Sequence, residues 1–571
     1  MNRKVIFSVV IILTLAASVS IYVTISKTSD ISFPWDSAEH AWEGLIIASD
    51  IKAGDLVSFL GDTYRQGWWP FLHSWLLAPA FMIFGNTYAV ARLVSLLCVT
   101  IFVLIVYRIG LKMHPNQGIW IGLIVVCLCL TSRPYLVLSA MCMSEVPGML
   151  MTFITFFLYL KAINEKSNYF YLCTSFFLAI TLFTKWHHGV FVIFAVFITQ
   201  LSLNKKILSR NNLALFSPFL VMMLGWFAYP PHIASFFGHS TFQPHFYTFL
   251  SFDNLLYYPK SFLQVYHSSG IIAVILGVSF IIALKNIKKS ETRLFLAHIL
   301  IGIILLTIKL DNRHRYIVTI IPSIWLLGAT QLTGSIDSLM RFMKSKKSKI
   351  VSVAIVLSGI FVILYFSSLR NYRTYPEALL KQQFYCDNKL NKAYEFITDN
   401  SNKHNHIVVF SSWDYYNSLK GSTIKWNIEV GREQDKNNRI NKKSLANFYF
   451  FQMIQQKTKG SYEYFIRFLE NKNVNVTEYH LLSFMKILDL DAYQEFRNKN
   501  EINPFSDKIT DFDSLDKSVS CLITVHRDGE EELNLFSEQF MHTQREWREI
   551  NRERFSDLKI EVTIYVKAEG H

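Results

Sequence analysis

The sequence predicts a polytopic α-helical membrane protein with about 11 transmembrane helices, followed by a soluble C-terminal α/β domain. Composition is the first reason: 51% of the 571 residues are hydrophobic and only 18% are charged, whereas about a quarter of a soluble domain is charged. The second is a series of apolar runs long enough to cross a membrane as helices. The third is the charge distribution, because residues 1–369 contain 28 Lys and Arg against 13 Asp and Glu, whereas residues 370–571 contain 29 against 30.

These differences predict a membrane domain over residues 1–369 and a soluble domain over residues 370–571. The basic residues of the first part lie between hydrophobic runs rather than in one patch, so they do not indicate nucleic-acid binding. Cysteine spacing shows no zinc motif. The two cysteines of the soluble domain, Cys386 and Cys521, leave a disulfide between them as an open alternative.

Each apolar run of about 20 residues is expected to form one span, and shorter runs can span by tilting. The expected spans are residues 5–25, 88–107, 118–138, 144–160, 169–184, 186–202, 213–230, 269–285, 294–309, 316–333 and 350–367. The first follows Met-Asn-Arg-Lys and lacks a convincing cleavage site, so we interpret it as a retained anchor. Prolines and a histidine interrupt the apolar stretch 68–84, which we expect to lie in the interface as a helix.

Basic residues in short loops predict the orientation of the spans. Alternate loops between the expected spans hold 18 Lys and Arg, and these loops are therefore assigned to the cytoplasm. An odd number of spans then places the soluble domain and the loops 26–87, 231–268 and 310–315 outside. The expected location is the plasma or inner membrane, with the functional face outside the cytoplasm.

The outer loop 26–87 is unusually acidic, with seven Asp and Glu against three Lys and Arg. Within its helix-like segment 36–51, the residues Asp36, Glu39 and His40 share one face by their spacing. Spacing alone favours a solvated amphipathic helix on the membrane surface. A functional interpretation needs partners elsewhere in the chain.

Such partners occur at the outer ends of the expected spans. Arg92 lies near the start of the second span, Glu145 opens the fourth, and Lys185 separates the fifth from the sixth. Arg313 and Arg315 precede the tenth. Any one charge could be a snorkelling or packing residue, but an ionisable residue in a membrane is a functional candidate. Acids and cations at one face suit a phosphate-bearing lipid and a nucleophile that needs a base.

The soluble domain is expected to mix strands and helices. Residues 406–410 and 560–567 have the apolar pattern of strands, and residues 445–456 and 536–553 are interpreted as helices.

Several short motifs of the first 369 residues follow one another in a recognisable order. They are Trp35-Asp36-Ser37-Ala38-Glu39-His40, Trp69-Pro70-Phe71-Leu72-His73-Ser74-Trp75, Ser144-Glu145, Thr184-Lys185, and Arg313-His314-Arg315-Tyr316 with Pro322 beyond. That order resembles the GT-C superfamily, specifically glycosyltransferase family 39 and the lipid A aminoarabinose transferases. The chain departs from the family where Asp36-Ser37 stands for the usual Asp-Glu and where Gly67-Trp68-Trp69-Pro70 replaces a Lys-Pro-Pro element.

The resemblance implies a GT-C-like fold and an inverting enzyme. Such an enzyme would take one sugar from a polyprenyl-phosphate carrier, which is held in the membrane among its lipids. It would transfer this sugar to an acceptor that is a glycolipid, a protein or a glycan. A hydroxyl nucleophile needs a base, and this role falls to Asp36 with help from Glu39 or Glu145. Cations stabilise a phosphate leaving group, and the candidates are Lys185, Arg313 and Arg315. Further substrate-binding candidates are Tyr316, His40 and Arg92.

Three alternatives stay open at this point. Some GT-C enzymes hold a divalent metal at the first acidic loop, which would place one near Asp36, although no metal ligand is assigned. Ser412-Trp413-Asp414-Tyr415-Tyr416 resembles the acceptor motif of oligosaccharyltransferases, but it lacks one tryptophan and the glycine. A lipid-linked sugar flippase or transporter would predict charges at mid-membrane depth and inverted repeats, and the sequence shows neither.

Overall fold

The computed structural model describes most of residues 3–342 and five strands of the C-terminal part. The described residues are 3–27, 36–66, 69–85, 87–114, 117–204, 209–229, 232–233, 251–266, 270–309, 314–342, 396, 407–412, 448–453, 521–527, 547–555 and 560–567. The chain forms two compact units, Met1–Lys27 with Arg92–Leu380, and Thr28–Ala91 with Lys381–His571. The predicted domain boundary at residues 369/370 stays a prediction.

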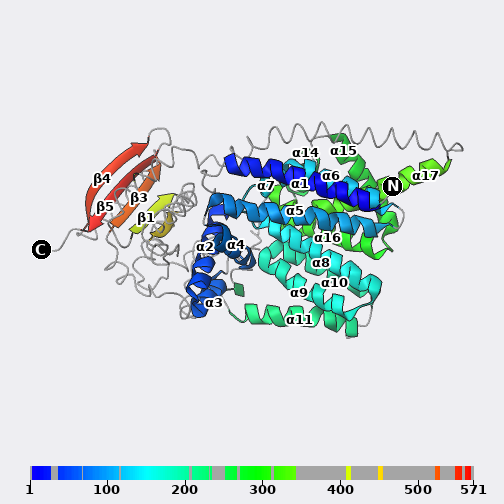
Figure 1. Cartoon of the computed structure of the whole chain (residues 1–571), viewed down its shortest axis with the longest axis horizontal. Helices are drawn as coiled ribbons and strands as arrows, with labels where there is room; N and C mark the ends of the chain where they lie inside the picture. The colour runs from blue at the N-terminus through cyan, green and yellow to red at the C-terminus, as the bar shows by residue number, and fades with distance from the viewer. Residues whose placement is uncertain are drawn as a thin grey trace. The chain divides into compact units, whose positions relative to one another are not determined.

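Within the part of the chain that the structure describes, the first unit is helical (Figure 1). Its α-helices are α1 (Arg3–Lys27), α5 (Tyr88–Met113), α6 (Gly118–Thr131), α7 (Arg133–Ser139), α8 (Glu145–Glu165), α9 (Asn168–Thr184), α10 (Trp186–Leu203), α11 (Arg210–Phe227), α14 (Phe252–Gln264), α15 (Gly270–Ala283), α16 (Ser290–Lys309) and α17 (Ile321–Phe342). Two 3₁₀ turns, η1 (Leu284–Asn286) and η2 (His314–Ile317), complete the set.

Five described helices are long and apolar enough to cross a membrane: α1, α5, α8, α10 and α16. The pair α6 and α7 passes the same test together, but it is bent by 66°. Pro134 lies in the first turn of α7, where proline fits because its missing N–H would be unpaired in any case. The chain is therefore a membrane protein. Ten of the 11 expected spans contain a helix; the last, 350–367, lies outside the described residues, so the count stays a prediction.

The helices of the first unit pack around a core of aromatic and aliphatic side chains. Helix α9 packs against α8, α10 and α11 (Figure 1). Helix α10 also packs against α16. The rings of Phe102 and Phe153 meet at 5.3 Å and those of Phe153 and Phe156 at 5.6 Å. Large apolar side chains such as Ile12 on α1 and Leu224 on α11 are exposed, as expected of helix faces that contact lipid.

The region of the tenth expected span differs from the prediction. Residues 316–333 were expected to be one span, but the chain first forms η2 and α17 begins only at Ile321. Pro322 lies in the first turn of α17, where proline favours a helix start. Arg315 therefore lies in a short 3₁₀ turn before the helix.

The second unit begins with three helices, α2 (Asp36–Ala53), α3 (Leu56–Arg65) and α4 (Leu72–Phe84). Helix α2 confirms the helix expected in the acidic loop, and α4 confirms a helix within 68–84. Gly54 separates α2 from α3 with a φ of +68°, a backbone conformation that glycine adopts without steric cost. The carboxylate of Asp55 then accepts from the backbone N–H of Ser58 at 2.9 Å and caps α3.

The C-terminal part of the second unit contains a five-stranded sheet in the order β2-β1-β3-β5-β4. Its strands are β1 (Ile407–Ser412), β2 (Phe448–Met453), β3 (Cys521–Arg527), β4 (Trp547–Phe555) and β5 (Ile560–Lys567). Strand β1 pairs in parallel with β2 and β3, whereas β5 pairs antiparallel with β3 and β4. The strands expected at 406–410 and 560–567 are confirmed.

The helices expected at 445–456 and 536–553 are wrong where the structure describes them, because β2 and β4 occupy these segments. Strand β4 lies at the edge of the sheet and carries charges on successive residues. Its Arg552 forms ion pairs with Glu549 at 2.7 Å and with Glu561 of β5 at 3.3 Å. Such charges are typical of edge strands, and they hide the alternation that would predict a strand.

Candidate functional site

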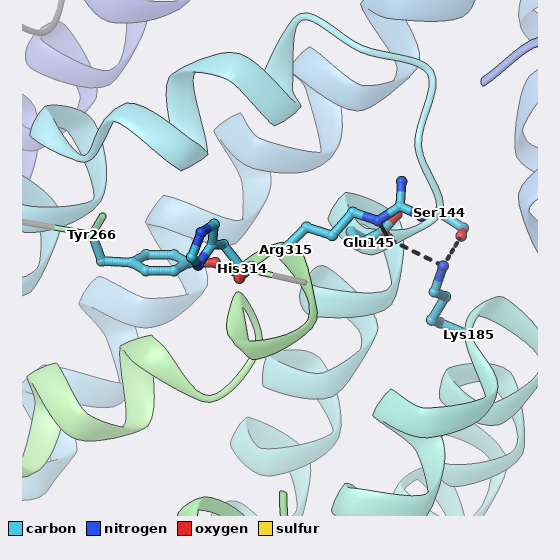
Figure 2. Close-up of polar contacts among 6 residues, drawn as sticks. All are labelled: Ser144, Glu145, Lys185, Tyr266, His314 and Arg315. Atoms are coloured by element: carbon cyan, nitrogen blue, oxygen red, sulfur yellow. Dashed lines mark hydrogen bonds and ion pairs between the residues drawn. The ribbon is translucent and has the colours of Figure 1, made fainter. Parts of the chain in front are cut away.

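A buried carboxylate, Glu145, lies at the centre of the candidate site (Figure 2). It is the first residue of α8 and its side chain is fully buried. A carboxylate in the first turn interacts favourably with the helix dipole. Its Oε1 lies 3.2 Å from Lys185 Nζ and 3.3 Å from Arg315 Nε. Lys185 also donates to Ser144 Oγ at 3.0 Å, and we call these four residues the Glu145 cluster.

Lys185 reaches this position because it is the single residue between α9 and α10. Its backbone is extended, with φ −155° and ψ 117°, and its N–H donates to Thr181 O at 3.1 Å. The side chain is only 1% exposed. A buried ammonium without a partner is very costly, so the carboxylate of Glu145 is what makes its burial tolerable.

Gly148 allows α8 and α10 to approach each other beside this ion pair. A Cβ at Gly148 would lie 2.6 Å from Nδ1 of His188 and 3.1 Å from Cβ of Lys185. Real Cβ atoms essentially never lie within 3.0 Å of a heavy atom of a residue that is not their neighbour in the chain. Glycine at position 148 therefore permits the packing that holds Lys185 close to Glu145.

Arg315 comes from η2 and completes the cluster from a third segment of the chain. Its side chain is 16% exposed, unlike those of Glu145 and Lys185. Its guanidinium carbon lies 5.5 Å from the centre of the Tyr316 ring, and that ring meets the ring of His187 at 5.0 Å. An anion that approaches the cluster would meet Arg315 first.

The charges within the Glu145 cluster do not cancel. One carboxylate faces one ammonium and one guanidinium, which leaves a net positive charge in a largely buried place. Phosphate oxygens accept charge-assisted hydrogen bonds from Arg and Lys, and these are stronger where water is excluded. The cluster thus has the electrostatics of a phosphate-binding site.

The structure brings together three of the predicted site residues, Glu145, Lys185 and Arg315, and it places Tyr316 directly beside them. Arg92 is fully buried on α5. Arg313 lies outside the described residues.

The acidic-loop candidates belong to the second unit. Asp36 and Glu39 lie on α2, and their side chains are outside what the structure describes. His40 is buried, with its ring 4.7 Å from that of His73 and 5.1 Å from that of Trp69. The expected meeting of Asp36 with Glu145 stays a prediction. A metal near Asp36 also stays a prediction. No group of three potential metal ligands occurs among the described residues, and the side chain of Asp36 lies outside what the structure describes.

Sequence reasoning missed three residues around η2: Tyr266, Ser261 and Tyr257. The Tyr266 hydroxyl donates to the His314 carbonyl at 2.6 Å (Figure 2). The His314 ring contacts Ser261 Oγ at 2.7 Å and stacks on Tyr257 at 5.1 Å. No motif indicates these contacts, because α14 and η2 are about 50 residues apart in sequence.

Comparison with known proteins agrees with the geometry. Residues 69–233 match the family model of dolichyl-phosphate-mannose-protein mannosyltransferases. The structure of ArnT from Cupriavidus metallidurans in the apo state matches over 98% of both chains, with 11% identity and a TM-score of 0.55. The chain is a membrane protein with the GT-C fold. The same ArnT bound to undecaprenyl phosphate matches this chain over 98% of both chains, with 10% identity and a TM-score of 0.53.

Other comparisons add little to this assignment. An oligosaccharyltransferase from Archaeoglobus fulgidus is 12% identical over 72% of this chain and 63% of the archaeal chain, with a TM-score of 0.43. A likeness of that size does not support the oligosaccharyltransferase alternative. No curated protein matches the sequence.

Proposed function

We propose that this GT-C protein is an inverting glycosyltransferase that moves a single sugar from a polyprenyl-phosphate carrier to an acceptor at the outer face of the membrane. The observation that carries the proposal is the Glu145 cluster, in which Lys185 Nζ and Arg315 Nε lie 3.2 and 3.3 Å from one buried carboxylate oxygen. The match to a polyprenyl-phosphate-bound ArnT structure supports the choice of donor. The acceptor is a lipid, a protein or a surface glycan.

The reaction needs positive charge close to the donor phosphate, where the bond between sugar and phosphate is cleaved. When the bond between the anomeric carbon and the phosphate oxygen cleaves, negative charge develops on the leaving phosphate. Lys185 and Arg315 would stabilise this charge, Arg315 through its planar fork and Lys185 as a point charge. Before the donor arrives, Glu145 holds both cations in place, so little reorganisation is needed when it binds.

The acceptor hydroxyl needs a base on the opposite side of the sugar. We assign this role to Asp36, with Glu39 orienting the acceptor, and His40, Tyr316, Arg92 and Arg313 as further substrate-binding residues. Inversion follows because the hydroxyl attacks opposite the departing phosphate. The proposed transfer requires no metal, since Lys185 and Arg315 supply the charge. A chelator should therefore leave the rate unchanged, and loss of activity would show that a metal is required.

Mass spectrometry of cell glycolipids and glycoproteins, with and without the protein, tests the proposal. We expect one product that carries a single additional sugar in cells with the wild-type chain. Cells that produce the Asp36→Asn variant at the same level in the membrane should lack this product. Unchanged products in both comparisons would contradict transfer, and a product with a whole added glycan would favour an oligosaccharyltransferase.

A further inference from the structure

Two buried tyrosine hydroxyls bind backbone carbonyls on either side of Arg315. Tyr266 donates to the carbonyl of His314, the residue immediately before Arg315, at 2.6 Å. Tyr135 on α7 donates to the carbonyl of Val318, three residues after Arg315, also at 2.6 Å. Each tyrosine is 2% exposed. The turn that carries Arg315 is thus hydrogen-bonded on both sides to tyrosines from other segments of the first unit.

The tyrosines are themselves held firmly. Ser132, between α6 and α7, donates to the backbone carbonyl of Tyr266 at 3.2 Å. The rings of Tyr135 and Tyr266 meet at 6.3 Å, and that of Tyr135 meets the fully buried Trp325 of α17 at 5.3 Å. Rings packed in this way lose little further entropy when their hydroxyls bind, so they are suitable anchors.

The turn has little intrinsic order of its own. The hydrogen bonds of a 3₁₀ helix have poorer geometry than those of an α-helix, and η2 is only 4 residues long. Its own backbone bonds include Val318 N–H to Arg315 O at 3.3 Å and Ile320 N–H to Ile317 O at 2.9 Å. A long, flexible arginine side chain on such a turn needs external anchors to keep its guanidinium in one place.

We infer that Tyr266 and Tyr135 are positioning residues, which fix η2 so that Arg315 presents its guanidinium to Glu145 and to the donor phosphate. The part that concerns the donor rests on the proposed function; the part that concerns Glu145 does not. Burial, with a smaller contribution from the charge of Glu145, raises the pKa of Tyr266 well above its usual value. Its hydroxyl therefore stays protonated and remains a donor at any physiological pH.

The first experiment measures whether Tyr266 controls the contact between Arg315 and Glu145 in the absence of lipid. Arg315→Gln, Glu145→Gln and the double variant form a thermodynamic cycle, which is read out as apparent Tm of the full-length protein in detergent. We expect the two changes to be clearly non-additive in the wild-type background. In the Tyr266→Phe background they should become additive, because Arg315 no longer lies against Glu145.

Tyr159→Phe is the matched control background. Tyr159 lies on α8, is fully buried and donates to Gln200 Oε1 at 3.0 Å, but it is about 21 Å from Glu145 along the helix. The Tyr159→Phe variant therefore loses a similar buried hydrogen bond, but far from the Glu145 cluster. The cycle in this background should remain non-additive. Coupling that persists with Tyr266→Phe, or that disappears equally with Tyr159→Phe, would overturn the inference.

The second experiment measures the dissociation constant of a polyprenyl phosphate without sugar for the full-length protein in nanodiscs. Loss of one anchoring bond loosens the turn that carries Arg315, and we expect Tyr266→Phe and Tyr135→Phe each to raise the constant about tenfold. Tyr159→Phe should leave it unchanged, and in an Arg315→Gln background Tyr266→Phe should have no further effect. If the wild type binds no polyprenyl phosphate while the cycle behaves as expected, the proposed function fails and the positioning role stands.

Discussion

At the scale of one residue, the burial of the Lys185 ammonium depends on its ion pair with Glu145. The ammonium is 1% exposed and pairs with a fully buried carboxylate. The Lys185→Ala change leaves Glu145 with Arg315 as its remaining partner within the Glu145 cluster. Removal of one partner of a buried ion pair costs about 3–5 kcal/mol. We therefore expect Lys185→Ala to lower the free energy of unfolding by an amount in this range and to weaken polyprenyl-phosphate binding.

Lys161→Ala is the control for this change. Lys161 pairs with Glu165 at 3.8 Å across one helical turn, and both side chains are substantially exposed. Exposed pairs contribute about 0–1 kcal/mol, and the contact of Lys161 Nζ with the Phe170 ring at 3.9 Å adds about 0.5–1 kcal/mol. The loss of stability should therefore be smaller than that of Lys185→Ala, and lipid binding should hardly change. Denaturation midpoints and lipid binding of both variants provide the comparison. Equal effects of the two substitutions would mean that burial does not make Lys185 special.

His314 predicts a pH dependence of stability. Partial burial lowers the pKa of His314 below its ordinary value, so the folded protein binds this proton less readily than the unfolded chain. Between the lowered pKa and about 6.5, the unfolded chain holds more protons, and stability falls as the pH decreases. We expect the Tm difference between pH 7.5 and pH 5.5 to shrink in His314→Gln. The same difference in both proteins would rule out a contribution from His314.

At the scale of elements, the close packing of α8 against the start of α10 holds Lys185 beside Glu145. A Cβ at Gly148 would lie 2.6 Å from His188 Nδ1, so Gly148→Ala overpacks a contact beside Lys185. Overpacking costs about 1–3 kcal/mol, and we expect lower stability together with weaker lipid binding. Unfolding midpoints and dissociation constants measure the two effects.

Gly225→Ala provides the matched control. Gly225 lies within α11, and a Cβ there would meet nothing within 4 Å. Alanine is a better helix former than glycine by about 1 kcal/mol, so this variant should be as stable as the wild type or more stable. If Gly148→Ala behaved in the same way, the close approach of α8 and α10 would not matter.

The sequence predicts the elements of the site better than it predicts their contacts. Lys185 stands out because it is the sole charge between two apolar runs, and such a break predicts where α9 ends and α10 begins. Arg315 was expected immediately before a span but lies in η2, because the chain forms a 3₁₀ turn before Pro322. The bonds from Tyr135 and Tyr266 to this turn join residues that are 183 and 48 positions apart. Local patterns carry no information about such pairs.

At the scale of the whole molecule, composition predicts a membrane part correctly and predicts the C-terminal elements only in part. Strands β1 and β5 are apolar and therefore visible in the sequence, whereas β2 and β4 resemble helices. For β4 the reason is its position at the sheet edge, where charged side chains replace the usual alternation. Tertiary context decides between strand and helix in such segments.

The proposed reaction assigns the general base to Asp36, which lies on the acidic helix α2. If Asp36 is the base, Asp36→Asn should reduce sugar transfer by at least about a hundredfold, because general base catalysis contributes 10²–10⁴-fold. It should leave membrane insertion and polyprenyl-phosphate binding intact, since the charge that binds phosphate comes from Lys185 and Arg315. Transfer assays and lipid binding on the same preparation separate the two roles, and a variant that still transfers sugar would remove Asp36 from the mechanism.

The most direct test of the central claim is the dissociation constant of polyprenyl phosphate for the wild type and for Arg315→Gln in nanodiscs. The guanidinium of Arg315 is the most accessible cation of the Glu145 cluster, and a charge-assisted hydrogen bond contributes about 1.5–3 kcal/mol. We predict that the variant binds the lipid at least about tenfold more weakly, with a smaller difference at high salt. Equal affinities of the two proteins for the lipid would contradict a phosphate-binding role for the Glu145 cluster.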